Sequence, residues 1–571
     1  MTSHSKPGKG REKILLTLLP FWAPLIPPVG IANLKSFLQE RNFTVATFDG
    51  NAAEEFRDFS AVYFDLLKEV VPAEKWGNFY VVGKDVLQNH MMAYLEDDEK
   101  KDAEKYNHAI RILVQKTFFC EIDDTVVRRL NRVLADFYTR LERWFTALLE
   151  REKPALVGFS VFESTLPASL FAARLTKAKN PDINVIMGGG VFSEQLALGS
   201  PNLDFFLEKA PYVDKIFIGE GEKLFLDYLE DRLPAEQRVY TLADIGSKTL
   251  DLSTVALPDY SDFDIGQYPF VAAYTSRSCP FQCSFCSETV FYGKYRKKSA
   301  PQIVSEMTGL YEKYGQQLFL MCDSLLNPVV HDLSREFINS GKIMYWDGYL
   351  RADKHVCDIE NTLLWRRGGF YKAKLGLESA SPRVLELMNK KITPNQIQQA
   401  VSSLARAGIK TSTCWIIGHP GETEEDFQLT LDMVETLKDD IYEVWACPFY
   451  YYPSAQAGMN GWEEKTYLLY PAWMKEMLII QTWYPECEPS REEVYRRMYR
   501  FVEHCESLGI PNPFTMYDLY RADRRWEKLQ KNAVPSIMEF EKGAGYIDDT
   551  GGVIKLVEAR SQLQEEGDFD F

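Results

Sequence analysis

Short apolar runs alternate with helically periodic segments along the first part of the chain. The runs at 13–19, 43–49, 155–160 and 183–190 have the length and composition of buried strands, and the apolar residues of 29–42 recur with helical spacing. Strands that alternate with helices predict a parallel sheet covered by helices. Ligands of such sheets bind at the carboxyl ends of the strands.

A charged stretch at about residues 52–153 interrupts this series. Its apolar residues follow a helical pattern, most clearly at 126–152, so it predicts a helical subdomain inserted into the first domain. Residues 236–268 hold turn-forming residues and few periodic apolar runs, which is typical of a linker. We therefore expect residues 1–235 to form a doubly wound, Rossmann-like domain that contains the helical insertion.

A second series of strands and helices follows the linker. Its expected strands are 270–276, 317–323, 343–350, 371–379, 410–418 and 442–452. About six strand–helix repeats predict a partial (β/α)6 barrel over residues 269–455. From 456 to 571 the pattern becomes helical and rich in Trp, Tyr and Arg, so we expect a mainly helical region that caps the barrel and contacts substrate. The overall fold class is α/β.

Charge and cysteine usage narrow the class of protein. The 571-residue chain has a net charge of −17, so a broad surface for nucleic acid is not expected. Its ten cysteines are mostly scattered singly, which favours a reducing cytoplasm over secretion. The apolar run at 14–34 could be mistaken for a signal peptide, but four prolines interrupt it and a helix and a strand follow directly. We therefore expect a cytoplasmic protein with neither nucleic acid nor membrane as a partner.

The stretch "SRSCPFQCSFCSE" (276–288) places three cysteines close together after an expected strand. Thiolates suit zinc, copper(I) or iron–sulfur clusters. A closed structural zinc site needs four ligands, and no fourth cysteine lies nearby in the sequence. A cubane cluster held by three thiolates would leave one iron open for substrate or cofactor. Three incidental or zinc-binding cysteines remain the alternative.

This loop resembles that of the radical S-adenosylmethionine (SAM) enzymes, whose barrel carries CxxxCxΦC after its first strand. The resemblance implies that Cys279, Cys283 and Cys286 hold a 4Fe–4S cluster. The open iron would bind the amino and carboxylate groups of SAM, and electron transfer would release a 5′-deoxyadenosyl radical. An electron donor such as flavodoxin or ferredoxin is then an expected partner.

Later barrel segments carry the same resemblance. "GLESASPRVLELMNKKIT" is similar to the fourth-strand segment that meets the SAM ribose, and "WIIGHPGETEEDF" is similar to the fifth-strand segment near adenine. An arginine at the end of the third strand could pair with the SAM carboxylate through two parallel hydrogen bonds. The implied SAM contacts are Glu378, Ser379, Arg351, Ile417 and Gly418. Taken singly, Glu378 could be only a capped or solvated residue, and Arg351 a structural ion pair.

Two glycine-rich turns, 188–190 and 219–222, follow expected strands of the first domain. Such turns let backbone amides approach a phosphate or nucleotide, although each could be an ordinary tight turn. Ahead of a radical SAM barrel they resemble the cobalamin-binding domain that precedes many such barrels. The implied cobalamin contacts are Ser160, Gly188, Gly189, Gly190, Gly219, Glu220 and Gly221. No histidine lies in the DxHxxG pattern, so cobalt is expected to lack a histidine ligand; loss of cobalamin is the alternative.

The two resemblances together imply a cobalamin-dependent radical SAM methyltransferase. It would move a methyl group from methylcobalamin to an unactivated carbon, or to phosphorus, of a substrate radical. The alternative is a non-methylating enzyme with the same domains that catalyses a rearrangement, cyclisation or oxidation. A tRNA methylthio-transferase would need a second cluster, yet Cys120 is the only cysteine before Cys279. A non-enzymatic, metal-stabilised binding protein is a further alternative.

Three residues at the expected barrel mouth are candidates for contact with the reacting groups. Asp323 ends the second strand, and Tyr450 and Tyr452 end the last one. A tyrosine run on a strand usually alternates between core and surface, so a structural role is the competing interpretation. The substrate itself is left open as a small molecule, a peptide or a carrier-bound intermediate.

Overall fold

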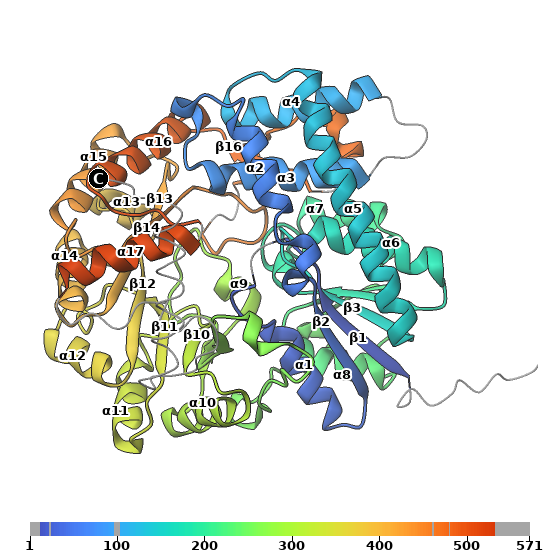
Figure 1. The fold of residues 1–571 in the computed structure, drawn as a ribbon, viewed down its shortest axis with the longest axis horizontal. Coiled ribbons are helices and arrows are strands. Elements are labelled where there is room, and N and C mark those ends of the chain that lie inside the picture. Colours follow the sequence, from blue (N-terminus) through green and yellow to red (C-terminus); the bar gives the residue numbers. More distant parts are fainter. Residues whose placement is uncertain are drawn as a thin grey trace, which may run out of the picture.

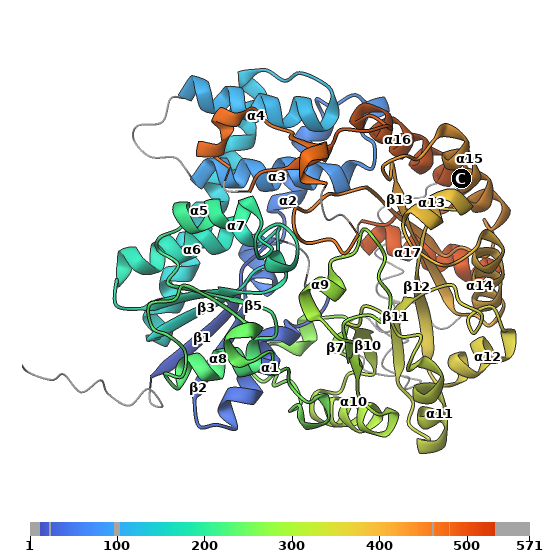
Figure 2. The same ribbon diagram turned by 180° about the vertical axis from the view of Figure 1, so that it is seen from behind.

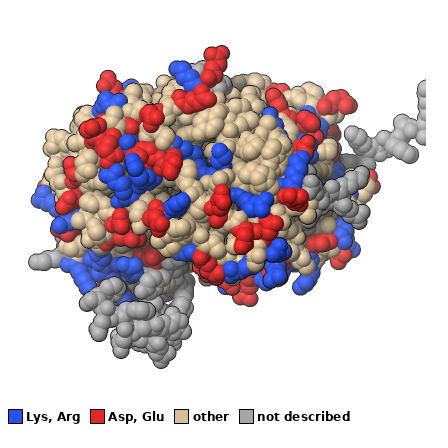
Figure 3. Space-filling model, turned by 90° about the horizontal axis from the view of Figure 1, so that it is seen from above, with Lys and Arg blue, Asp and Glu red and all other residues tan. Residues whose placement is uncertain are grey.

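The computed structural model describes residues 12–21, 24–95, 103–458, 462–478, 480–514 and 516–530. These residues form two six-stranded parallel sheets, each flanked by helices, which stand side by side (Figure 1). The predicted α/β fold class is confirmed. On the face in Figure 3, Lys and Arg side chains are interspersed with Asp and Glu side chains. Within the described ranges, no helix is both long and apolar enough to cross a membrane.

The first sheet has the strand order β2-β1-β3-β4-β5-β6. Its strands are β1 (Lys13–Leu18), β2 (Thr44–Asp49), β3 (Leu156–Ser160), β4 (Asn184–Gly188), β5 (Lys215–Ile218) and β6 (Val239–Thr241). The flanking helices are α1 (Val29–Gln39), α6 (Leu166–Lys179), α7 (Pro201–Lys209) and α8 (Gly221–Leu229). Strand β6 lies inside the segment predicted to be a linker. It belongs to the sheet because it pairs in parallel with β5.

Four helices are inserted between β2 and β3: α2 (Phe59–Lys68), α3 (Phe79–Leu95), α4 (Ala103–Phe118) and α5 (Asp124–Glu152). They lie at the top of Figures 1 and 2. The Asp123 side chain caps α5 by accepting from the amides of Thr125 and Val126, and Lys153 ends it in the left-handed conformation. The Nδ2 of Asn78, just before α3, donates to the carbonyl of Ala446 in the second sheet at 2.7 Å. The insertion therefore contacts both α/β units.

The second sheet has the order β14-β13-β12-β11-β10-β7. Its strands are β7 (Val271–Ala273), β10 (Leu318–Met321), β11 (Tyr345–Leu350), β12 (Phe370–Glu378), β13 (Lys410–Ile417) and β14 (Glu443–Pro448). Helices α10 (Ala300–Tyr314), α11 (Val330–Ser340), α12 (Ile359–Arg367), α14 (Pro394–Arg406) and α15 (Glu424–Thr436) lie outside it (Figure 2). Large apolar side chains such as Trp346 and Trp415 are fully buried between the sheet and these helices. The opposite face is left for the barrel interior.

The C-terminal region combines helices with a small antiparallel pair of strands. Strands β15 (Thr466–Leu468) and β16 (Trp483–Pro485) pair with each other, and α16 (Arg491–Ser507) and α17 (Met516–Leu529) follow. Helix α16 packs against β13 and β14, while apolar residues of 469–478, together with Ile480, join the apolar core of the inserted helices. The predicted helical region thus also contains two strands, and its part after residue 530 lies outside the described residues.

Candidate active site

The cysteine loop lies at the carboxyl end of β7. It is framed by the antiparallel pair β8 (Ser276–Arg277) and β9 (Arg296–Lys297) and by helix α9 (Glu288–Tyr292). The segment after α13 (Pro382–Leu387) anchors it, because the Ser284 amide donates to the carbonyl of Met388 at 3.0 Å. The side chain of Asn389 donates to the carbonyl of Gln282 at 2.6 Å. The loop is therefore held from outside its own hairpin.

All three loop cysteines are free thiols, and Cys283 is buried. Burial raises the pKa of Cys286 to about 12 and also raises that of Cys279, so without a metal these two thiols stay protonated. Within the described parts of the chain, no group of three His, Cys, Asp or Glu side chains is placed for one shared metal ion. A cubane does not need such a group, because each of its thiolates binds a different iron. Three soft donors on one loop fit a cluster of this kind.

Arg351 lies directly beside this loop. Its Nη1 is 3.7 Å from the Sγ of Cys283, and its guanidinium lies 4.0 Å from the ring centre of Phe281. The Asn327 side chain accepts a hydrogen bond of 2.8 Å from the Arg351 amide and donates one of 2.9 Å to the Arg351 carbonyl. The buried Nη2 of Arg351 has no hydrogen-bond partner among the described residues. A buried guanidinium with an unused donor is suited to an anionic group such as the carboxylate of SAM.

Glu378 ends β12 in the left-handed region, with φ of 66°. This turn directs its carboxylate to Lys390, whose Nζ lies 2.7 Å from Oε1. Lys390 also lies 5.6 Å from the ring centre of Phe285 in the cysteine loop. The neighbouring Ser379 accepts a bond of 3.1 Å from the amide of Ser381. Glu378 and Arg351 are thus brought to the same loop by two different strands.

Ile417 and Gly418 are placed differently from each other. Ile417 is 1% exposed, and its side chain belongs to the apolar core. Gly418 has φ of 79°, and a Cβ there would lie 2.3 Å from the Val494 side chain. Glycine is therefore required at 418 by the close approach of α16. The predicted adenine contact at these two positions is restricted to backbone atoms.

Asp323 differs from the expectation that it is available to a reacting group. Its carboxylate accepts bonds from the amide and hydroxyl of Thr275 and from the hydroxyl of Ser276, with oxygen–oxygen distances of 2.7 and 2.6 Å. The pKa of Asp323 is raised, because burial outweighs these hydrogen bonds, which lower it. These bonds engage its carboxylate, so the side chain ties the end of β10 to the start of the cysteine loop.

The glycine turn after β4 lies against the segment that follows β3. Gly189 has φ of 114°, and a Cβ there would lie 2.7 Å from the backbone of Val161. Ser160 and Gly188 are partners in the β3–β4 register, so both lie at the same carboxyl edge. A Cβ on Gly190 would meet the ring of Phe162 at 2.9 Å. Bare backbone and small side chains therefore form this part of the edge.

The turn after β5 carries an ion-pair network that the sequence analysis did not predict. Glu220 and Glu222 are buried, and both pair with Arg277, two residues before Cys279. Glu220 also pairs with Arg296. The Glu220 side chain is therefore paired with two arginines of the β8–β9 pair, and its contact with cobalamin stays a prediction. Gly219 and Gly221 flank it at this junction.

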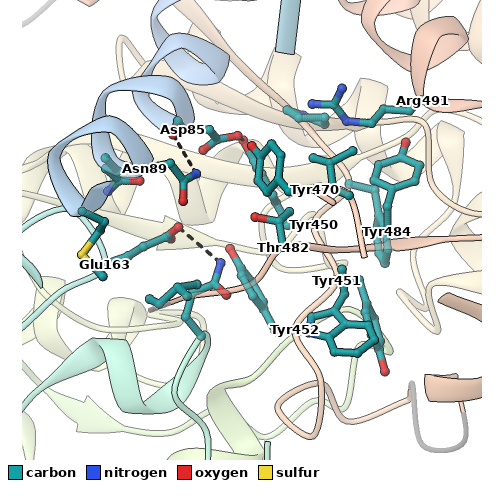
Figure 4. A pocket seen from close by; sticks show the side chains of 18 of the residues that line it. Asp85, Asn89, Glu163, Tyr450, Tyr451, Tyr452, Tyr470, Thr482, Tyr484 and Arg491 are labelled. Carbon is teal, nitrogen blue, oxygen red and sulfur yellow. Dashed lines mark hydrogen bonds between the residues drawn. The ribbon is translucent and has the colours of Figure 1, made fainter. Parts of the chain in front are cut away.

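A pocket, shown in Figure 4, lies near the cysteine loop, because Phe285 of this loop packs against Tyr451, which lines the pocket. Its empty space is about 810 Å³, open solvent included, and it lies between α3, the end of β14 and the β15–β16 region. Tyr450 and Tyr452 both line it, and their rings are stacked with centres 6.3 Å apart. The side chain of Gln456 donates to the carbonyls of Phe285 and Tyr450 at 2.9 and 2.8 Å. The segment that forms one pocket wall is thereby bonded to the cysteine loop.

Comparisons with known proteins agree with this architecture. Residues 274–434 match the profile of the radical SAM superfamily. The structure of the radical SAM methyltransferase TsrM from Kitasatospora setae, with tryptophan substrate and a SAM analogue bound, superposes with a TM-score of 0.59. It is 15% identical and covers 97% of this chain and 100% of its own. The predicted family resemblance is confirmed: the chain contains a radical SAM domain and has the TsrM-like two-domain fold.

The curated relatives match this chain over only part of its length. An uncharacterized methyltransferase of Pyrococcus horikoshii is 26% identical over 317 residues, which is 51% of this chain and 66% of the relative. The anaerobic magnesium-protoporphyrin IX monomethyl ester cyclase of Rubrivivax gelatinosus is 26% identical over 326 residues, 52% of this chain and 56% of the relative. The chain thus spans between about half and two thirds of these relatives.

Proposed function

We propose that the protein is a cobalamin-dependent radical SAM methyltransferase. It would transfer a methyl group from methylcobalamin to an unactivated carbon, or to phosphorus, of its substrate. The observation that carries this proposal is the loop of Cys279, Cys283 and Cys286 at the carboxyl edge of a radical SAM barrel, beside a Rossmann-like sheet. When bound, the cluster and SAM would supply a 5′-deoxyadenosyl radical, and cobalamin would supply the methyl group.

The chain's own residues would bind and orient these groups. The three cysteines would hold the cluster, and the unused Nη2 of Arg351 would donate to the carboxylate of SAM. Glu378, fixed by Lys390, would accept from the ribose hydroxyls. Backbone atoms of Ile417 and Gly418 and the hydroxyl of Ser379 would border the adenosyl group. The tyrosine-lined pocket would exclude water from the substrate, as radical chemistry requires.

An exposed apolar edge supports the cobalamin part of the proposal. Leu25, Phe162 and Leu198 follow β1, β3 and β4 and are 40%, 42% and 57% exposed. A contiguous patch of exposed apolar side chains marks a binding surface, and we propose that these three side chains contribute to one. A flat macrocycle would cover them, while Ser160, the 188–190 turn and the backbone of Gly219 and Gly221 would receive its polar periphery. No histidine would bind cobalt from the DxHxxG position, because the chain lacks this pattern.

A second candidate is a non-methylating enzyme that uses the same cofactors. The similarity to the anaerobic cyclase of Rubrivivax gelatinosus favours it, because that relative is similar at the same 26% identity as the methyltransferase from Pyrococcus horikoshii. We also propose a small-molecule, peptide or carrier-bound substrate and a reductant of the flavodoxin or ferredoxin type. Neither proposal involves nucleic acid or a membrane.

Cofactor content tests the proposal. The full chain is produced anaerobically with cobalamin, iron and sulfide, and bound iron and corrinoid are measured after desalting. About four irons and one corrinoid per chain are expected, and Cys283→Ala loses the iron while the matched Cys357→Ala keeps it. Four irons without corrinoid would exclude methylation from cobalamin. In turnover, S-adenosylhomocysteine together with 5′-deoxyadenosine indicates methyl transfer, whereas 5′-deoxyadenosine alone indicates the second candidate.

A further inference from the structure

The pocket beside the cluster loop carries two carboxylates on one side (Figure 4). Asp85 comes from α3, and Glu163 comes from the segment between β3 and α6. Neither forms an ion pair within the part of the chain that the structure describes. Their side-chain hydrogen bonds are long: 3.3 Å from the Tyr450 hydroxyl to Asp85 and 3.3 Å from the Gln195 amide to Glu163. Both carboxylates therefore keep free acceptor positions.

Burial disfavours the charged form of both carboxylates. Burial, with the nearby charge of Glu163, raises the pKa of Asp85 to about 7, and burial also raises the pKa of Glu163. Lys84 and Arg491 are the positive groups that act on this wall, and both lower the pKa of Asp85 without cancelling the effect of burial. A cation placed against the wall would restore both negative charges.

Arg491 does not provide that cation. Its guanidinium donates to the carbonyl of Lys116 and to the hydroxyl of Tyr495, the latter at 2.9 Å. It lies 4.4 Å from the ring centre of Tyr495 and 5.9 Å from that of Tyr484. Figure 4 shows it on the other side of the pocket from Glu163. The guanidinium is enclosed by aromatic rings and backbone, away from Glu163.

The pocket also contains a buried polar group that no protein atom satisfies. Gln88, one turn after Asp85 on α3, is 6% exposed, and its Nε2 has no hydrogen-bond partner among the described residues. The Nε1 of Trp483, which also lines the pocket, is likewise unpaired within the described chain. Buried polar groups are seldom left unpaired, so these two donors indicate a ligand with polar atoms as well as apolar surface.

Aromatic rings form the rest of the wall. Tyr450, Tyr451 and Tyr452 come from the end of β14, and Trp483 and Tyr484 come from β16. Tyr450 and Tyr452 lie nearly parallel, with an angle of 10° between their rings. Flat aromatic walls select flat apolar ligands and also stabilise cations placed near their faces.

We propose that this pocket binds the substrate and that the substrate is an arylalkyl ammonium compound, with its ring against the tyrosines and its cationic nitrogen against Asp85 and Glu163. The proposal rests on the proposed function for the role of the ligand as substrate. The pocket lies close to the proposed cluster site, because Gln456 joins the tyrosine segment to the cysteine loop. The adjoining Ala457 and Gly458 amides also donate to the loop, to the carbonyls of Cys286 and Ser284.

Binding is measured by calorimetry on the full chain, with cofactors and without them. The probes are 2-phenylethylamine and tryptamine, with 2-phenylethanol and 3-phenylpropanoate as the matched neutral and anionic compounds. At least one amine is expected to bind at least tenfold more tightly than both matched compounds. Glu163→Gln and Asp85→Asn are each expected to remove this preference while leaving 2-phenylethanol binding unchanged. The control Glu142→Gln, on the exposed side of α5, keeps it.

The outcomes separate this proposal from the proposed function. Amines that bind no better than the alcohol, or a preference that survives Glu163→Gln, would overturn the pocket assignment even if SAM is cleaved. A selective amine site in a chain that holds no cluster would leave the assignment standing and refute the enzyme. Thermal unfolding of each variant shows whether it is folded. If Asp85→Asn is not, Tyr452→Leu replaces it, with weaker binding of amine and alcohol alike expected.

Discussion

The ion pairs between the β5–α8 turn and the β8–β9 pair give a quantitative test of how the first domain supports the cluster loop. Glu222→Gln removes one charge and nearly preserves the shape of the side chain. Arg277 then keeps only Glu220, at 3.1 Å, and Glu220 is shared with Arg296. The positive charge of Arg277, next to the cysteine loop, is then only partly balanced by negative charge.

The expected loss follows from burial. The side chains of Glu222 and Arg277 are 6% and 13% exposed, so the pair belongs to the buried class. Removing one partner of a buried pair costs about 3–5 kcal/mol, because the remaining charge is uncompensated. Since Glu220 stays in contact, we expect the lower end, about 3 kcal/mol, which is a factor of roughly 100 in the opening equilibrium.

Hydrogen exchange measures this opening locally, which a global melt of a multidomain chain does not. Amides of 276–277 and 296–297 are expected to exchange about 100-fold faster in Glu222→Gln. The control Glu54→Gln removes a pair whose side chains are 46% and 85% exposed, and it should change exchange by less than about fivefold. In the double variant Glu222→Gln/Arg277→Met, the loss of local stability should be smaller than the sum of the losses in Glu222→Gln and Arg277→Met alone. Unchanged exchange, or additive losses, would refute the coupling.

Three further predictions concern single residues. Burial alone would raise the pKa of Glu222, but Arg277 outweighs burial and lowers this pKa. The ion pair is therefore fully stabilising above the ordinary glutamate pKa of about 4.3, and it weakens as the pH falls through the lowered pKa of Glu222. Amide exchange rates measured across this pH range check the prediction. Arg351→Gln should weaken SAM binding roughly thirtyfold in anaerobic titration with iron content unchanged. Gly189→Ala, whose Cβ would lie 2.7 Å from Val161, should lower the melting temperature more than Gly199→Ala, where φ is also positive but no atom lies within 4 Å. Equal shifts would contradict the last prediction.

The cysteine loop could be predicted because its chemistry depends on local spacing. Cys279, Cys283 and Cys286 lie within one loop, so the pattern is visible without tertiary structure. The barrel strands could be predicted for a related reason, since each is an apolar run between helices. Strand β6 could not, because Val239–Thr241 is too short to show a pattern and is recognised only by its pairing with β5.

The ion-pair network and the pocket could not be predicted, because their partners are far apart in the sequence. Glu222 and Arg277 are separated by 55 positions, and Asp85 and Tyr450 by 365. A charged residue in a turn and a carboxylate on an inserted helix look like ordinary surface residues until the fold buries them. Asp323 shows the opposite error, since its position at a strand end indicated availability, whereas Thr275 and Ser276 occupy its carboxylate.

Under the proposed function, some parts of the chain would bind the cofactors and other parts would bind the substrate. The ends of the regular strands carry the cysteine loop, Arg351 and Glu378. A scaffold of this kind can support many reactions. The pocket walls come instead from the inserted helix α3, the end of β14 and the β15–β16 region. Because Gln456 bonds the tyrosine segment to the cysteine loop, a change in these walls would, under the proposed function, also move the substrate relative to the radical source. Specificity and reaction geometry would then be coupled through this segment.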